Sequence, residues 1–264
     1  MQLATDQMIA EKRDGIGWMT FNNPERRNAL TVEMREAAIE IIRDFAADDA
    51  VRVVVMKGAG DKAFVSGADI SQFESQRSTP EQVAAYAALT QRFEGALSGL
   101  EKPLIAMIRG YCLGGGLAVA LTADIRIAAD DAQFGVPAAR LSIGYGYGGT
   151  RKLVDLVGPS CAKEMLFSAR RYKAPDALRM GLVNQVVPVA ELEPTVADLA
   201  GTIAGNAPLT IRTAKSIIGE ILKDPADRDL AACERAVDRC MSSADYVEGR
   251  RAFMEKRKPA FTGT

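Results

Sequence analysis

Histidine is absent from the sequence of 264 residues. Its absence excludes Ser-His-Asp and Cys-His catalysis, His-ligated zinc and proton shuttling by imidazole. Cysteine is scarce, and Cys112, Cys161, Cys233 and Cys240 form no C-x-x-C pair. In a chain of this length that shows no secretory signal, we therefore expect free thiols and no metal site.

Long apolar segments are also missing. The longest run without a charged residue, Gly110–Ala123, has 14 residues and is rich in glycine, whereas a membrane-spanning helix needs about 20 apolar residues. The first residues include Asp6 and no apolar stretch, unlike a signal peptide. We expect a soluble, cytoplasmic protein without a membrane partner.

Neither sign of charge is in excess. The 33 Lys and Arg residues nearly balance 34 Asp and Glu residues, for a net charge of −1. Nucleic acid is therefore disfavoured as a partner, because proteins that bind it usually carry a basic excess. A hydrophobic fraction of 48% provides a sizeable core and excludes disorder as the main state.

Strands and helices alternate over about the first 190 residues. Thr31 is a plausible N-cap for a helix whose apolar residues recur at helical spacing, and further helices are expected at 79–100 and 117–122. From Glu191 onward the pattern is helical and charged. This order is typical of the α/β class, followed by a helical domain or oligomerisation element. Strands are predicted at residues 16–21, 51–56, 104–108, 125–128 and 183–187.

Two glycine loops, Phe64–Ile70 (FVSGADI) and Tyr111–Gly116 (YCLGGG), each follow a predicted buried strand and precede a predicted helix. Such loops expose free backbone N–H groups, which can bind a phosphate or a developing oxyanion. The alternative is a tight turn in which glycine permits close packing. For Asp69 the alternative is a helix-start cap, and Asp124 is interpreted as structural.

The stretch Gly144–Gly149 matches G-x-G-x-x-G literally. A dinucleotide site is disfavoured, since no convincing strand precedes the stretch and no acid lies about 20 residues beyond it. A nicotinamide-dependent oxidoreductase is retained only as a third hypothesis.

Taken together, these loops and their flanking segments resemble the crotonase (enoyl-CoA hydratase/isomerase) superfamily, in register from about residue 10 to the end. The matching segments are PERRNAL at 24–30, KAFVSGADI at 62–70, KPLIAMIRGYCLGGG at 102–116, ADIRIA at 123–128, FG at 134–135, GGTRKL at 148–153, GLV at 181–183 and EGRRAFMEKRKPAF at 248–261.

The resemblance implies a crotonase-like spiral of ββα units over residues 1–195 and a helical trimerisation region over 196–264. Trimers of this superfamily often pair into hexamers. The implied substrate is an acyl-CoA thioester of fatty acid metabolism. Coenzyme A enters as part of the substrate, and no other cofactor is expected.

The resemblance also assigns a site. The backbone N–H groups of Ala68 and Gly115 would form the oxyanion hole for the thioester carbonyl. The basic cluster near the C-terminus, otherwise a solvated helix face, becomes a candidate CoA contact. The residues expected to contact CoA are Glu25, Arg26, Arg27, Ser66, Ala68, Asp69, Ile70, Phe253 and Lys256, the last two from this or a neighbouring subunit.

The sequence departs from the hydratase pattern at two positions. Hydratases of this superfamily carry glutamates where this chain has Ala118 and Ala138, and an alanine can neither activate water nor deliver a proton. The expected neighbours of the acyl group are Arg140, Tyr145 and Tyr147. Tyr145 stands where methylmalonyl-CoA decarboxylase-like members also carry a tyrosine; its alternative is a packing aromatic.

Several functions remain open. A crotonase-type lyase or isomerase is the leading hypothesis, with the identity of the reaction unassigned. Decarboxylation of a malonyl-CoA-type substrate, or thioester hydrolysis, fits the two alanines better than standard hydration, because an enolate or oxyanion can be stabilised by the backbone alone. A catalytically silent CoA-binding protein is the alternative outside the enzyme class.

Overall fold

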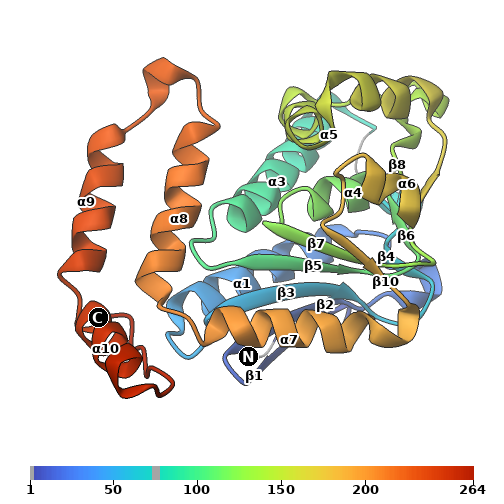
Figure 1. Cartoon of the computed structure of the whole chain (residues 1–264). Helices are drawn as coiled ribbons and strands as arrows, with labels where there is room; N and C mark the ends of the chain where they lie inside the picture. Colours follow the sequence, from blue (N-terminus) through green and yellow to red (C-terminus); the bar gives the residue numbers. More distant parts are fainter. Residues whose placement is uncertain (1–2, 73–77) are drawn as a thin grey trace.

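Two β-sheets form the centre of the structure (Figure 1), a computed structural model that describes residues 3–72 and 78–264. The larger sheet has the order β1-β2-β3-β5-β7-β10, and only its edge strand β1 runs antiparallel to its neighbour. Its strands are β1 (Met8–Arg13), β2 (Ile16–Phe21), β3 (Val53–Gly58), β5 (Leu104–Ile108), β7 (Ile125–Ala129) and β10 (Gln185–Val187).

The smaller sheet has the order β4-β6-β8-β9, with β4, β6 and β8 parallel. Its strands are β4 (Ala63–Val65), β6 (Tyr111–Leu113), β8 (Gln133–Gly135) and β9 (Tyr172–Lys173). Three successive units, β3-β4-α3, β5-β6-α4 and β7-β8-α5, each place the first strand in the larger sheet and the second in the smaller one. The expected ββα spiral is therefore present.

The helices surround these sheets and continue to the C-terminus. Thr31 caps the first helix as predicted, because its hydroxyl accepts a hydrogen bond from Met34 N at 3.2 Å, and Thr79 caps α3 in a capping box with Gln82. The helices are α1 (Val32–Ala47), α3 (Pro80–Ser98), α4 (Gly115–Ala120), α5 (Tyr147–Ser168), α6 (Ala174–Arg179), α7 (Leu192–Ala204), α8 (Pro208–Ile221), α9 (Leu230–Met241) and α10 (Ala244–Glu255).

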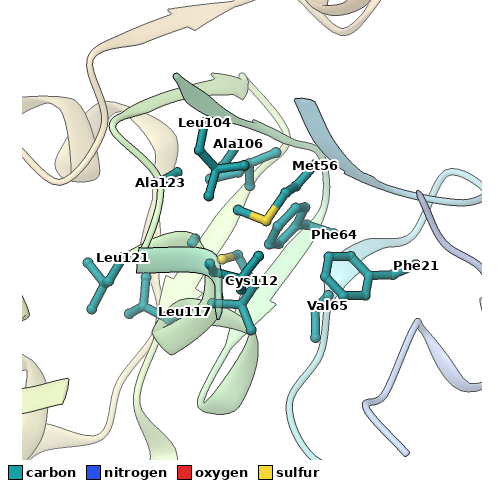
Figure 2. Packing of buried hydrophobic residues seen from close by; sticks show 14 of the residues in the cluster. Phe21, Met56, Phe64, Val65, Leu104, Ala106, Cys112, Leu117, Leu121 and Ala123 are labelled. Carbon is teal, nitrogen blue, oxygen red and sulfur yellow. The ribbon is translucent and has the colours of Figure 1, made fainter. Parts of the chain in front are cut away.

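The larger sheet is buried on both faces. In β5, Leu104, Ala106 and Ile108 belong to the main core between the sheets, whereas Ile105 and Met107 belong to a second core under α7. This alternation follows from the period of two along a strand. Figure 2 shows the main core, where Phe21, Met56 and Phe64 pack near Cys112 and Leu117.

The longer strands were predictable from their apolar runs. The strands predicted at 16–21 and 104–108 coincide with β2 and β5, and those at 51–56, 125–128 and 183–187 overlap β3, β7 and β10. The prediction missed β1 and all four strands of the smaller sheet, which have two or three residues each. Such short strands give no measurable periodicity.

The boundary predicted between residues 195 and 196 falls inside α7. Leu192, Val196 and Ala200 of this helix are buried against the larger sheet, so α7 belongs to the core. Helices α8, α9 and α10 stand beside the core (Figure 1). Lys215 of α8 ties them to it, donating to Asp124 Oδ2 at 2.8 Å and to the Lys102 carbonyl at 2.9 Å.

Candidate active site at the ends of the small-sheet strands

The parallel strands of the smaller sheet bring three loops to one edge. Ala63 pairs with Tyr111, and Cys112 pairs with Phe134, so the chain leaves β4, β6 and β8 at neighbouring points. The first two of these loops are the glycine loops of the sequence, and the third begins at Val136. The two glycine loops therefore start from the short strands β4 and β6, and do not follow directly on the strands predicted at 51–56 and 104–108.

Ala68 and Gly115 meet at this edge. A Cβ placed on Gly115 would lie 3.5 Å from the Ala68 nitrogen. On either side of Ala68, the Leu30 N–H donates to the Gly67 carbonyl (2.8 Å) and the Asp69 N–H donates to the Leu30 carbonyl (3.0 Å). Gly115 is the first residue of α4, so its N–H has no acceptor within the helix. The two predicted oxyanion-hole residues are thus adjacent.

Glycine is required where α4 approaches β4. A Cβ on Gly116 would lie 1.9 Å from the Val65 carbonyl oxygen, which no side chain tolerates. Gly114 has φ +52° and ψ −116°, a conformation that L residues rarely adopt. The interpretation of the triple glycine as a close-packing element is therefore confirmed, and this packing holds Gly115 beside Ala68.

The helix starts predicted after the two loops differ from expectation. The first loop leads into a three-residue 3₁₀ turn, Ile70–Gln72, and residues 73–77 after it lie outside the described part of the chain. The second leads into α4, which has six residues. Helices this short contribute little macrodipole, so any anion binding here relies on individual N–H groups.

Residues 24–28 lie against the first glycine loop. The Asn28 side chain is buried and donates to the carbonyls of Ala59 (2.9 Å) and Ala63 (2.7 Å), while Ser66 N donates to the Arg27 carbonyl at 3.1 Å. This arrangement places the predicted CoA-contact segments side by side. The side chains that remain exposed there are those of Glu25, Arg26, Arg27 and Ile70.

Asp69 is paired with Arg26. Their closest atoms, Oδ2 and an Arg26 guanidinium nitrogen, are 3.0 Å apart, and Ser71 donates to the same carboxylate from its backbone (3.0 Å) and hydroxyl (2.7 Å). Desolvation raises the pKa of Asp69, but these bonds outweigh it and hold the pKa below the usual value. The predicted capping role of Asp69 is therefore present, and a contact with CoA stays a prediction.

The positions of the two missing glutamates lie in the elements that follow β6 and β8. Ala118 is on α4, and Ala138 is in the 3₁₀ turn Pro137–Arg140; both are partly buried. Arg140 is exposed at the end of this turn. Tyr147 is 79% exposed at the start of α5, so within this chain it does not line an enclosed acyl pocket.

Tyr145, unlike the exposed Tyr147, points its hydroxyl into the protein interior. Its hydroxyl is buried, and within the part of the chain that the structure describes it has no hydrogen-bond partner. Its ring packs against Gly149, where an added Cβ would lie 2.9 Å from a ring carbon. Burial, followed by the negative charge of Glu94, raises the pKa of the Tyr145 phenol above its usual value.

Phe253 and Lys256 are far from this edge. They belong to α10 and its C-terminal cap, on the opposite side of the molecule from β4 and β6 (Figure 1). The Phe253 side chain is 82% exposed, and the neighbouring Arg257 is held by Glu248 and Glu255. A contact of Phe253 or Lys256 with CoA would therefore come from a neighbouring copy of the chain.

The G-x-G-x-x-G stretch does not follow a strand. It begins after the 3₁₀ turn Pro137–Arg140 and runs into α5, of which Gly146 is the N-cap and residues 147–149 are the first turn. Over residues 3–72 and 78–264, no cluster of three or more Cys, Asp or Glu side chains could hold a metal ion. Over the same residues, no helix combines the length and apolar character needed to cross a bilayer.

Comparison with known proteins agrees with this geometry. The sequence profile of the enoyl-CoA hydratase/isomerase family matches residues 11–264. The chain is 38% identical to the short-chain-enoyl-CoA hydratase of Clostridium acetobutylicum (96% of each chain) and 37% identical to the crotonyl-CoA hydratase of Syntrophomonas wolfei (98% of this chain, 99% of the relative).

Solved structures show the same fold. An enoyl-CoA hydratase/carnithine racemase from Magnetospirillum magneticum superposes with a TM-score of 0.92 at 36% identity, over 99% of this chain and 97% of that one. The fold is therefore that of the crotonase superfamily. The chain belongs to the enoyl-CoA hydratase/isomerase family.

Proposed function

We propose that the chain binds an acyl-CoA thioester with its carbonyl oxygen between the N–H groups of Ala68 and Gly115. The observation that carries this proposal is the adjacency of these two residues at the edge of the smaller sheet. Paired backbone donors stabilise the negative charge that develops on such an oxygen. CoA would run along Glu25–Arg27 and Ser66–Ile70, which lie side by side.

The reaction we favour is decarboxylation of a malonyl-CoA-type thioester. The bond between the α-carbon and the carboxylate breaks and CO₂ leaves. The electron pair of this bond stays with the α-carbon and is delocalised onto the thioester oxygen, and the two N–H groups stabilise the resulting enolate oxygen. This step needs no strong base, which suits alanine at positions 118 and 138. Hydrolysis of the thioester would use the same oxyanion hole and is the related alternative.

A second candidate is hydration of a short enoyl-CoA. The names of the relatives from Clostridium acetobutylicum and Syntrophomonas wolfei favour it. Addition of water requires one group to activate the water and another to protonate the α-carbon. In this chain both groups would have to come from residues other than 118 and 138.

One assay separates these reactions. The purified protein is incubated with enoyl-, malonyl- and β-ketoacyl-CoAs, and the products are identified by mass spectrometry. Release of CO₂ from a malonyl-CoA-type substrate supports the favoured reaction, whereas rapid hydration of crotonyl-CoA would replace it by the second candidate. Turnover of any thioester excludes a catalytically silent role, and failure to bind CoA thioesters in calorimetry refutes the proposal.

We also propose that the C-terminal helices form a homotrimer, alone or paired into a hexamer. Helices α8, α9 and α10 enclose a groove of about 950 Å³, and Phe253 and Met254 at its margin are 82% and 80% exposed. Apolar side chains exposed together mark interaction surfaces. Light scattering after size-exclusion chromatography tests this: a monomer would refute it. We place the protein in the cytoplasm, in fatty acid metabolism.

A further inference from the structure

The carbonyl of Gly67 and the N–H of Ala68 belong to one peptide group. This peptide is trans, so its carbonyl and its N–H point in opposite directions. The Leu30 N–H donates to the Gly67 carbonyl at 2.8 Å, which turns the Ala68 N–H away from Leu30. The position of Leu30 therefore sets the direction in which the proposed oxyanion donor points.

Leu30 is in turn held by the side chain of Arg35. Nη1 of Arg35 donates to the carbonyl of Leu30 at 3.2 Å and to the carbonyl of Thr31 at 2.9 Å. The Leu30 carbonyl also accepts the Asp69 N–H at 3.0 Å, so both of its lone pairs are used. Residues 30 and 31, which precede α1, are thus tied both to that helix and to the first glycine loop.

The guanidinium of Arg35 has a fixed position. Arg35 lies in α1 and is only 3% exposed. Its Nη2 donates to the Tyr86 hydroxyl of α3 at 2.6 Å, and its Cζ lies 4.8 Å from the centre of the Tyr86 ring. A guanidinium carries its donors in one rigid plane, so bonds to two carbonyls and a phenol leave it little freedom to rotate. Helices α1 and α3 together support residues 30 and 31.

The two carbonyls would have donors even without this side chain. The Leu30 carbonyl accepts the Asp69 N–H, and the Thr31 carbonyl accepts the backbone N–H of Arg35 at 3.4 Å. Burying a guanidinium removes its hydration, which is costly unless hydrogen bonds replace it. Satisfying the backbone does not require this cost. What Arg35 adds is a second bond to each carbonyl, from a group that is itself immobile.

We propose that Arg35 is a positioning residue for the oxyanion hole, because through Leu30 it fixes the orientation of the Gly67–Ala68 peptide. The inference rests on the proposed function and extends it to a residue outside both glycine loops. Arg35 acts through the backbone and not by contact with the substrate. Its effect on the reaction follows from the need for oxyanion donors to be in place before the negative charge develops.

Arg35→Met removes the donors and keeps a long side chain in the same space. We expect kcat for malonyl-CoA or crotonyl-CoA to fall by about 10–10²-fold, because a small displacement of a group at the reacting centre is enough for such a loss. The Kd of CoA itself should change little, since CoA has no thioester carbonyl. Arg43→Met, the same change at an exposed position of α1, is the matched control and should behave as wild type.

The direct measurement is the infrared stretch of the thioester carbonyl in bound butyryl-CoA, labelled with ¹³C at that carbon. Butyryl-CoA can be neither hydrated nor decarboxylated. In the wild type, bonds from the two N–H groups should lower the frequency below its value in free solution. In Arg35→Met the band should return toward that value. A loss of stability alone would not move the band of ligand bound to folded protein.

Arg35→Lys gives a second variant, which also decides the matter if Arg35→Met does not fold. An ammonium is a point charge and cannot reproduce the planar arrangement of donors to two carbonyls and the Tyr86 hydroxyl. Its kcat and its carbonyl band should lie between those of the wild type and those expected for Arg35→Met. Wild-type values of both in Arg35→Lys would overturn the inference.

Unchanged kcat in Arg35→Met, or a carbonyl band that stays in its wild-type position, would also overturn it. Equal losses in Arg43→Met would do the same. If the wild type does not bind butyryl-CoA in calorimetry, or binds it without lowering the carbonyl frequency, the proposed function itself fails and the inference fails with it. The wild-type band therefore tells the two failures apart.

Discussion

The backbone of Gly115 lies directly against the nitrogen of Ala68, with 3.5 Å between that nitrogen and the point where a Cβ of Gly115 would be. Two segments 47 positions apart in the sequence are brought together because β4 and β6 pair in parallel. Because there is room for a Cβ at Gly115, the effect of removing its N–H can be compared with the effect of only adding a Cβ.

Gly115→Pro should lower thioester turnover by about 10²–10³-fold, the usual effect of removing one oxyanion-hole donor. Proline is well tolerated at the first position of a helix, where the N–H has no helical partner. Gly115→Ala is the control, because it retains the N–H and its Cβ would make only an ordinary contact. Steady-state kinetics checks the pair; equal activities would exclude this N–H from catalysis.

Restoring both carboxylates should change the reaction. The double variant Ala118→Glu/Ala138→Glu should gain hydration of crotonyl-CoA, because both side chains start from the loops beside Gly115. The rate is followed by the loss of enoyl absorbance, with each single variant as a control. A double variant that folds, binds crotonyl-CoA and does not hydrate it would show that more than the carboxylates is missing.

Gly116→Ala should lower the free energy of unfolding, because it disturbs the backbone packing of α4 against β4. The added methyl would lie 1.9 Å from the Val65 carbonyl oxygen, so backbone must shift, at a cost of about 1–3 kcal/mol or more in free energy of unfolding. Urea denaturation measures this. Gly219→Ala on α8, with no atom within 4 Å of its Cβ position, is the control and should be neutral or slightly stabilising.

The C-terminal segment should loosen in acid. Glu248 accepts bonds from Arg257 (2.6 and 2.9 Å) and from Ala260 N (2.9 Å), which lower its pKa to about 2. Because the folded pKa lies below the ordinary value of 4.5, Glu248 contributes stability above about pH 4.5, and this contribution is lost as the pH falls toward 2.

Hydrogen exchange at the Ala260 amide, compared between wild type and Glu248→Gln, measures this contribution. Protection should be greater in the wild type at neutral pH, and the difference should shrink between pH 4.5 and 2. A difference that stays constant over this range would show that the ionised Glu248 carboxylate is not its source.

The sequence could predict β2, β3, β5 and β7 of the larger sheet because they are mainly apolar runs of five or six residues. It could not predict β1, which is as long but half polar and mostly exposed. The strands of the smaller sheet could not be read in this way, since β4 has three residues and β9 two. The adjacency of Ala68 and Gly115 came from the family resemblance.

The placement of the C-terminal helices relative to the sheets could not be predicted from the sequence. Phe253 was predicted to contact CoA from this or a neighbouring subunit, and because α10 lies across the molecule from the glycine loops, only the neighbouring subunit fits that prediction. Residues beyond 195 looked like one helical region, yet α7 packs on the sheet and α8 does not. Helical periodicity reports that a helix has an apolar face, and it does not report which surface covers that face.

In the smaller sheet, the residues that hold the strands together are different from the residues that would face a substrate. Its hydrogen bonds are made by the backbones of β4, β6 and β8, whereas residues 68, 118 and 138 lie beyond the strand ends. Substitution at these three positions leaves every interstrand bond intact. An architecture of this kind can therefore change the groups that face the substrate by altering a few side chains, without altering the sheet that holds them.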